Sequence, residues 1–158
     1  MEYGRYFLFP SAVFAEKNPY HITTILGSCI AVCLYDPFTM TGGINHYMLP
    51  LWNGDGLASP KYGNIAIEKL IDKMGFLGCQ KANLHAKIFG GGNVLQTTDP
   101  ASSIGNRNIE LAYHVLREEG IRIIASSIGG SLGRKIIFNS HTGEVLHKFL
   151  NSHTIPEP

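Results

Sequence analysis

The chain has 158 residues, of which 44% are hydrophobic and 16% charged, and its formal charge is +1. This length suits one domain with its own core, and the balanced charge argues against a nucleic-acid partner, which usually needs a basic surface. Three cysteines without paired spacing indicate reduced thiols. Apolar runs stay short of the roughly 20 residues that span a bilayer, and the first residues lack a signal-peptide pattern. We therefore expect a cytoplasmic protein that is not inserted in the membrane.

Short extended segments are predicted for the first part of the chain. Residues 6–9 and 12–15 combine aromatic and aliphatic side chains, which is typical of strands. Residues 21–25 form a further extended segment that leads into Gly27.

Two longer apolar runs follow, over residues 29–35 and 43–49, and a turn-forming Asp-Pro pair separates them. This pattern predicts an antiparallel hairpin. A turn centred just after Pro37 places Cys29 opposite His46, with Cβ atoms roughly 4.5–5.5 Å apart. A bulge at the two glycines that begin the second run would shift this register.

A thiol next to an imidazole has a specific chemistry. The imidazole of His46 can take the proton of Cys29, and the resulting thiolate can attack an amide carbonyl. Gly27 and Ser28 precede the cysteine and leave room for backbone N–H groups to face a developing oxyanion. The alternative is structural, with Cys29 a small buried side chain and His46 a satisfied histidine of a strand.

The middle of the chain alternates between loop and regular structure. A polar loop over residues 51–60 carries Trp52, either as a platform at the rim of a site or as a packed surface aromatic. Apolar residues at helical spacing over residues 66–74 predict an amphipathic helix that ends at Gly75. Residues 84–89 then alternate in character and predict a strand.

The strand is followed by a glycine run, Gly90 and Gly91 with Gly92, that lacks both the Lys-Ser/Thr of a phosphate-binding loop and the spacing of a dinucleotide fingerprint. We interpret it as a tight backbone turn and expect no cofactor. Histidines and cysteines form no pair at metal-ligand spacing, so we expect no metal, and Cys33 and Cys79 are most simply structural.

The last third of the chain predicts a second helix and three strands. The helix begins at residue 104 or 105 and ends before Gly120, and the strands cover residues 121–125, 135–138 and 144–149. Six or more strands with two main helices, outside a regular βαβ repeat, predict an α/β (α+β) sandwich with mixed or antiparallel sheets. We expect a single catalytic domain over residues 1–150 and a polar tail over residues 151–158.

Several of these segments together resemble the chemoreceptor glutamine deamidase family (CheD), in the family's order and over most of the chain. The segments are Leu-Gly-Ser-Cys-Ile-Ala-Val at residues 26–32 with Asp36, Gly-Ile-Asn-His-Tyr-Met-Leu-Pro at 43–50, Lys-Tyr-Gly at 61–63, Ala-Lys-Ile-Phe-Gly-Gly at 86–91, Ile-Gly-Asn-Arg-Asn at 104–108, the glycine pair at 129–130, Gly-Arg at 133–134 and Thr-Gly at 142–143.

The resemblance implies residue roles. The catalytic cysteine, histidine and threonine of the family correspond to Cys29, His46 and Thr23, with the threonine orienting the imidazole ring. It also implies that Gly90 and Gly91, like the Gly27–Ser28 turn, lie near the catalytic cleft. Two positions depart from the family pattern, because Ser127 stands where an acidic residue is usual and Gly92 where a small alanine is usual.

The implied activity is hydrolysis of specific glutamine side-chain amides in the cytoplasmic helices of chemoreceptors, through a thioester on Cys29, with release of ammonia. The family is also credited with hydrolysing receptor methyl esters, and many members bind the chemotaxis phosphatase CheC. Two alternatives remain open from the residues. One is another thiol acyl-transfer enzyme, a peptidase or a transglutaminase-like protein, and the other is a binding module without enzyme activity.

Overall fold

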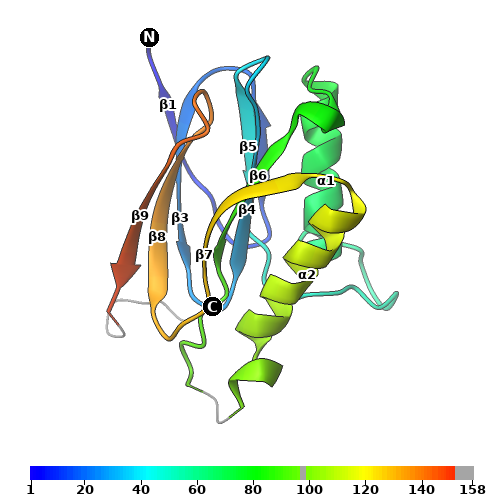
Figure 1. Ribbon diagram of the computed structural model, residues 1–158, viewed down its shortest axis with the longest axis vertical. Coiled ribbons are helices and arrows are strands. Elements are labelled where there is room, and N and C mark those ends of the chain that lie inside the picture. The colour runs from blue at the N-terminus through cyan, green and yellow to red at the C-terminus, as the bar shows by residue number, and fades with distance from the viewer. Residues whose placement is uncertain (97–98, 152–158) are drawn as a thin grey trace.

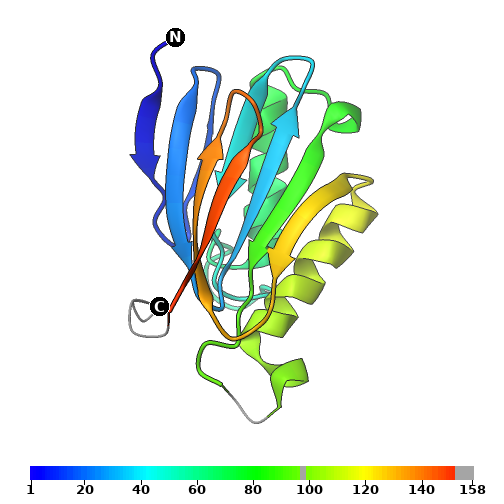
Figure 2. The same cartoon turned by 60° about the vertical axis from the view of Figure 1, so that its left-hand side comes forward.

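The computed structural model describes residues 1–96 and 99–151. All of the tail predicted for residues 151–158, except Asn151, lies outside the described residues. The predicted sandwich is confirmed, with three layers: two β-sheets face each other and two helices cover the outer face of one of them (Figure 1, Figure 2). No helix in the described part of the chain is long and apolar enough to cross a membrane.

The first sheet has four strands in the order β1-β3-β8-β9. β1 and β3 are parallel, whereas β3 with β8 and β8 with β9 are antiparallel. The bounds of these strands are β1 (Gly4–Phe7), β3 (Tyr20–Leu26), β8 (Gly133–Asn139) and β9 (Val145–Leu150).

The second sheet has five strands in the order β2-β5-β4-β6-β7 and is also mixed, because only the β6–β7 pair is parallel. Strand β4 lies at its centre, which agrees with its nearly uniform burial. The bounds are β2 (Val13–Glu16), β5 (Thr41–Asn45), β4 (Ile30–Asp36), β6 (His85–Gly90) and β7 (Arg122–Ile128).

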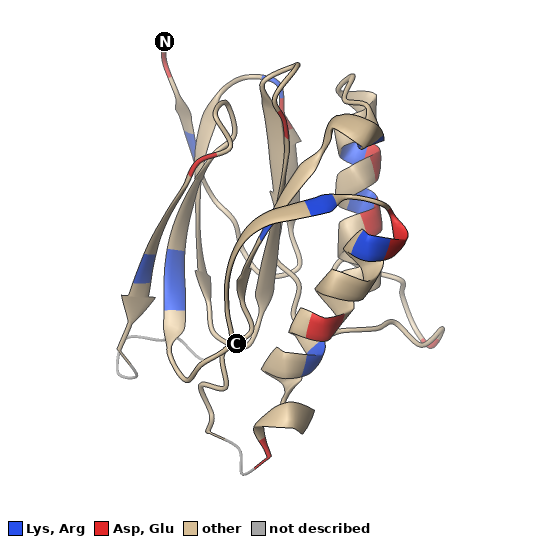
Figure 3. Cartoon of the chain, in the orientation of Figure 1, with Lys and Arg blue, Asp and Glu red and all other residues tan. Residues whose placement is uncertain are grey.

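Two helices, α1 (Gly63–Phe76) and α2 (Ile104–Glu118), pack on the five-stranded sheet through apolar stripes. The stripe of α1 is the predicted one, with Ala66, Ile67, Leu70 and Met74 all buried. The exposed faces of both helices carry charges of both signs (Figure 3). Short 3-10 turns, η1 (Lys81–Asn83) and η2 (Pro100–Ser102), precede β6 and α2.

The ends of the helices can be compared with the capping and stop residues in the sequence. Ser103 caps α2, since its Oγ accepts a hydrogen bond from the Asn106 N–H at 3.1 Å, and Gly120 follows the helix with φ +70°. For α1 the predicted end at Gly75 is slightly early. The helix continues to Phe76, and Gly78 takes the left-handed conformation with φ +97°.

The β4–β5 hairpin exists, but its predicted register is wrong by two residues. Asp36 pairs with Thr41, so the connection has four residues rather than two. The Asp36 carboxylate accepts hydrogen bonds from the N–H groups of Phe38 and Thr39, and Met40 closes the loop with φ +52°. Because the shift is even, every side chain keeps its predicted face of the sheet.

Candidate active site

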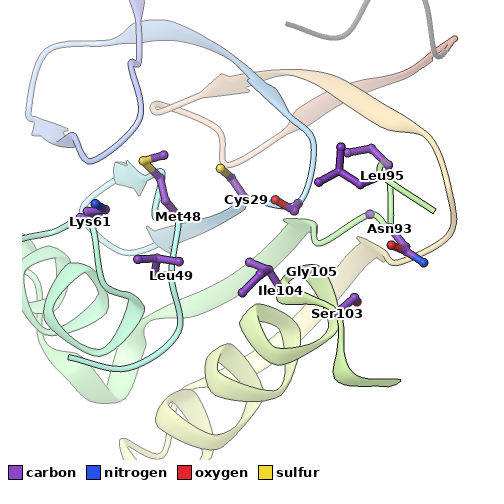
Figure 4. A pocket seen from close by; sticks show the side chains of 12 residues that line it. Cys29, Met48, Leu49, Lys61, Asn93, Leu95, Ser103, Ile104 and Gly105 are labelled. Carbon is purple, nitrogen blue, oxygen red and sulfur yellow. The ribbon is translucent and has the colours of Figure 1, made fainter. Parts of the chain in front are cut away.

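Cys29 lies at the end of the layer between the two sheets, immediately before β4, and only 4% of it is exposed. It faces a cleft of about 360 Å³ beside the first turn of α2 (Figure 4). The cleft is lined by Ser28, Cys29, Met48, Leu49, Lys61, Gly92, Asn93, Val94, Leu95, Ser103, Ile104 and Gly105.

His46 is a diagonal neighbour of Cys29 rather than its direct partner. The backbones of Ile30 and Tyr47 form a bridge, and continuing this register places Met48 opposite Cys29 and Ala31 opposite His46. Diagonal side chains on one face of a sheet remain within reach of long or aromatic side chains. The thiol and the imidazole therefore share the inter-sheet layer, although the expected direct pairing is wrong.

The proton on the His46 ring is assigned by a chain of two hydrogen bonds. The Thr24 hydroxyl donates its single proton to the Leu8 carbonyl at 2.7 Å, and its oxygen lies 2.8 Å from His46 Nδ1. Since a hydroxyl has only one proton to donate, Nδ1 must be the donor in the second bond. His46 Nε2 is then the unprotonated nitrogen.

His46 Nε2 is positioned to accept a proton. It is buried and has no hydrogen-bond partner among the described residues. A buried nitrogen with an unused lone pair is costly for stability and is typical of a group kept free for chemistry. Nε2 is therefore the atom of His46 that can act as a general base towards the thiol.

Thr23 does not lie beside His46, as its expected role of orienting the imidazole ring requires. Side chains alternate along β3, so Thr24 points into the inter-sheet layer towards His46, whereas Thr23 points to the outer surface of the four-stranded sheet. There it lines a shallow groove with Arg5, Phe7 and Lys135. The threonine that touches the imidazole ring is the next residue along the chain.

Burial keeps both reactive groups neutral in the resting site. Burial raises the pKa of the Cys29 thiol to about 11, although a backbone hydrogen bond partly opposes the shift. Burial also lowers the pKa of His46 to about 4. At neutral pH the site thus holds a thiol and an uncharged imidazole, and the thiolate forms only when its proton moves to Nε2.

The glycine run forms hydrogen bonds with the backbone of the segment that carries Cys29. The Gly91 N–H donates to the Cys29 carbonyl at 2.9 Å, and the Gly92 N–H donates to the Gly27 carbonyl at 3.0 Å. A Cβ at Gly90, where φ is +109°, would lie 2.2 Å from the Cys29 carbonyl oxygen. Of the residues expected to line the cleft, Ser28 does so, whereas Gly27, Gly90 and Gly91 lie behind the lining.

Asn108 was not singled out from the sequence, yet it joins the two reactive segments. Its side chain is fully buried in α2, and its amide nitrogen donates to the carbonyls of Ser28 and Met48, both at 3.0 Å. The Tyr47 hydroxyl in turn donates to the Asn108 carbonyl at 2.5 Å. Asn108 is the last residue of the Ile-Gly-Asn-Arg-Asn segment that resembles the family. A polar side chain on the face of a helix that packs against a sheet is the sequence feature that could have indicated its role.

The other two cysteines lie away from the cleft. Cys33 is buried between the sheets, and burial raises the pKa of its thiol. Cys79 follows α1, and its sulfur lies 3.5 Å from the Thr39 hydroxyl. The described residues contain no group of three or more His, Cys, Asp or Glu side chains that could hold a metal ion.

Comparison with known proteins gives a consistent result. Residues 48–149 match the family model described as CheD chemotactic sensory transduction. The chain is 54% identical over 142 residues to a probable chemoreceptor glutamine deamidase CheD of Trichlorobacter lovleyi, covering 90% of this chain and 88% of the relative. Proteins with the same name in Sulfurimonas denitrificans and Rhodospirillum rubrum are 48% and 40% identical, covering 95% and 92% of this chain and 97% and 82% of theirs.

Proposed function

The chain belongs to the CheD family, and from this membership and the geometry of the cleft we propose that it deamidates glutamine side chains of chemoreceptors by thioester chemistry. In this proposal Cys29 is the nucleophile and His46 the general base, and Thr24 orients the ring. The matched family model begins at residue 48, after both reactive residues. Their proposed roles are therefore supported by the resemblance of residues 26–32 and 43–50 and by the geometry of the site. The observation that carries the proposal is the free, buried Nε2 of His46 in the layer that ends at the Cys29 thiol.

The first half of the reaction forms the thioester. The glutamine carboxamide enters the cleft, Cys29 Sγ attacks its carbon, and the thiol proton moves to His46 Nε2. The neutral resting pair supports transfer of this proton during the attack, without a stored thiolate. The first turn of α2 lines the same cleft, and the positive end of its dipole favours the oxyanion that develops.

The second half releases both products. His46 Nε2 returns its proton to the departing nitrogen, which leaves as ammonia, and the acyl group stays on Cys29. Water then loses a proton to Nε2 as it attacks the thioester carbon, and the regenerated thiol recovers that proton. The net reaction adds one water to the side-chain amide and yields glutamate and ammonia. The same steps would release methanol from a glutamyl methyl ester.

The proposal is tested on the cytoplasmic fragment of a chemoreceptor from the same genome. Incubation with the enzyme should release ammonia and raise the mass of defined glutamine residues by about one dalton, located by peptide mass spectrometry. Adding a primary amine separates the alternatives, because a transglutaminase-like enzyme would incorporate it, whereas a deamidase would continue to produce glutamate. An unchanged receptor fragment would contradict the proposal.

The proposed setting is the cytoplasm, where the helices of the receptor signalling domain would be the substrate. The family resemblance also implies binding to the chemotaxis phosphatase CheC, and we propose that CheC covers the cleft. Saturating CheC should then lower the rate of receptor deamidation, measured as ammonia release. A binary complex that leaves this rate unchanged would refute the competition.

A further inference from the structure

The cleft contains a single charged side chain among its described lining residues, that of Lys61. Its backbone is fixed, since its carbonyl accepts hydrogen bonds from the N–H groups of Met48 and Leu49 at 2.9 and 3.0 Å. Met48 and Leu49 are two and three residues after His46 on the chain. Lys61 is exposed, and no described carboxylate lies within ion-pair distance of its ammonium group. The backbone that carries this cation is therefore fixed at the cleft, and the ammonium group has no ion-pair partner among the described residues.

The side of the cleft across from Lys61 includes exposed apolar surface. Leu95 is 75% exposed and Ile104 is 39% exposed, and both line the cleft. Figure 4 shows Cys29 between these two sides, with Lys61 and Met48 on one side and Leu95 on the other. Exposed apolar side chains around a concave site are typical of a surface that binds a partner. The cleft thus presents one cationic side chain, Lys61, and exposed apolar surface at Leu95 to whatever carries the glutamine.

We infer that Lys61 determines which glutamines are deamidated by binding a carboxylate of the substrate next to the target residue. The inference rests on the proposed function and specifies its substrate: a receptor segment with an Asp or Glu near the glutamine and an apolar residue on the other side. In a helical segment, side chains three or four residues apart lie on the same face. The acidic residue is therefore expected within four positions of the glutamine.

The contact should act on substrate binding rather than on the chemical step. Lys61 lies at the edge of the cleft, so its attraction for a carboxylate is the same in the ground state and in the transition state. Such an interaction lowers KM and leaves kcat unchanged. A partly exposed ion pair corresponds to a change of roughly two- to fivefold, and reversing the charge of one partner adds repulsion to the loss of attraction. We therefore expect kcat/KM to differ by about tenfold between substrates with opposite charges at this position.

The test exchanges charges between enzyme and substrate. One receptor cytoplasmic fragment keeps its Asp and Glu residues within four positions of each glutamine, and a second fragment has them replaced by Lys. The wild-type enzyme should deamidate the acidic fragment with about tenfold higher kcat/KM, carried by KM, and this preference should weaken as salt increases. The Lys61→Glu enzyme should prefer the Lys-bearing fragment.

The matched control is Lys69→Glu, a charge reversal at an exposed position of α1 that does not line the cleft. It should retain the wild-type preference. If Lys61→Glu and wild-type enzyme discriminated equally between the two fragments, or if the deamidated glutamines had no acidic neighbour, the role of Lys61 would be refuted while the deamidase function stood.

A binding measurement keeps the two proposals separable. The two fragments are titrated into Cys29→Ala enzyme with and without Lys61→Glu, which needs no turnover. Reversal of the binding preference by Lys61→Glu supports the inference even if the wild-type enzyme releases no ammonia. An absence of any preference for the acidic fragment overturns it.

Discussion

At residue 24 a hydroxyl with one proton determines which ring nitrogen of His46, the proposed general base, can accept a proton. Because Thr24 donates to the Leu8 carbonyl, it can only accept from His46 Nδ1, and the lone pair of the ring is left on Nε2. The sequence contains Thr23 and Thr24 side by side in a strand. Which of them faces the histidine depends on which face of β3 packs against the second sheet, and this is a property of the tertiary structure.

The neighbouring threonines provide a matched pair of substitutions. Thr24→Val keeps the shape of the side chain but removes the acceptor of the Nδ1 proton, so we expect kcat for ammonia release to fall about tenfold or more. Thr23→Val changes the outer face of the same strand and should leave kcat near the wild-type value. Equal rates in the two variants would exclude Thr24 from orienting the ring.

The pKa shifts lead to a prediction about thiol reactivity. The Cys29 thiol has its pKa raised to about 11, and the pKa of His46 is lowered to about 4, so the free enzyme stores no thiolate at neutral pH. Alkylation of Cys29 by iodoacetamide should be slow at pH 7 and increase only as the pH rises above about 9. Peptide mass spectrometry of the alkylated protein follows this directly.

The pH dependence of alkylation distinguishes the neutral thiol–imidazole pair from the usual cysteine–histidine ion pair. In the ion pair a cationic imidazole depresses the pKa of the thiol. An ion pair would give rapid alkylation well below pH 8, and this rapid reaction would be lost in His46→Ala. Fast alkylation at pH 7 in the wild-type protein would show that the resting pair is charged. That result would contradict the neutral pair that burial of both groups predicts.

At the scale of elements, the sequence predicted the helices better than the hairpin. The apolar stripe of α1 and the stop at Gly120 are local signals, and both are confirmed. The hairpin register depends on Met40 adopting a positive φ, which non-glycine residues rarely do. The face shared by Cys29 and His46 was nevertheless predicted correctly, because an even shift preserves the alternation of side chains.

Asn108 connects elements, and its substitution tests that connection. Asn108→Ala leaves the buried carbonyls of Ser28 and Met48 without their donor, so we expect a loss of about 1–3 kcal/mol in the free energy of unfolding. Because Ser28 precedes Cys29, the proposed nucleophile, kcat should also fall. Arg107→Ala, at an exposed position of the same helix, is the control and should change stability by less than about 0.5 kcal/mol.

Chemical denaturation gives the free energies of unfolding, and ammonia release at saturating receptor fragment gives kcat for the same samples. A stable and fully active Asn108→Ala protein would show that the cysteine loop keeps its position without α2.

For the whole molecule, the sequence predicted the sandwich and the single domain but not how the strands divide between two sheets. The parallel pairings of β1 with β3 and of β6 with β7 join segments that local patterns cannot connect. Yet this division creates the site, because Thr24 of the four-stranded sheet meets His46 beside the five-stranded sheet. The site is therefore a product of sheet packing, with α2 and the glycine run holding the cysteine at its edge.

The central claim is that one of three buried cysteines carries the reaction, and ammonia release from the receptor fragment by single-cysteine variants tests it most directly. Cys29→Ala should abolish ammonia release while the thermal unfolding midpoint stays near that of the wild type. Cys33→Ala is the matched control, since Cys33 is also buried between the sheets, on the same strand face, but does not line the cleft. It should lower stability by about 1 kcal/mol or more and keep turnover once folded. Sustained deamidation by folded Cys29→Ala protein would contradict the account.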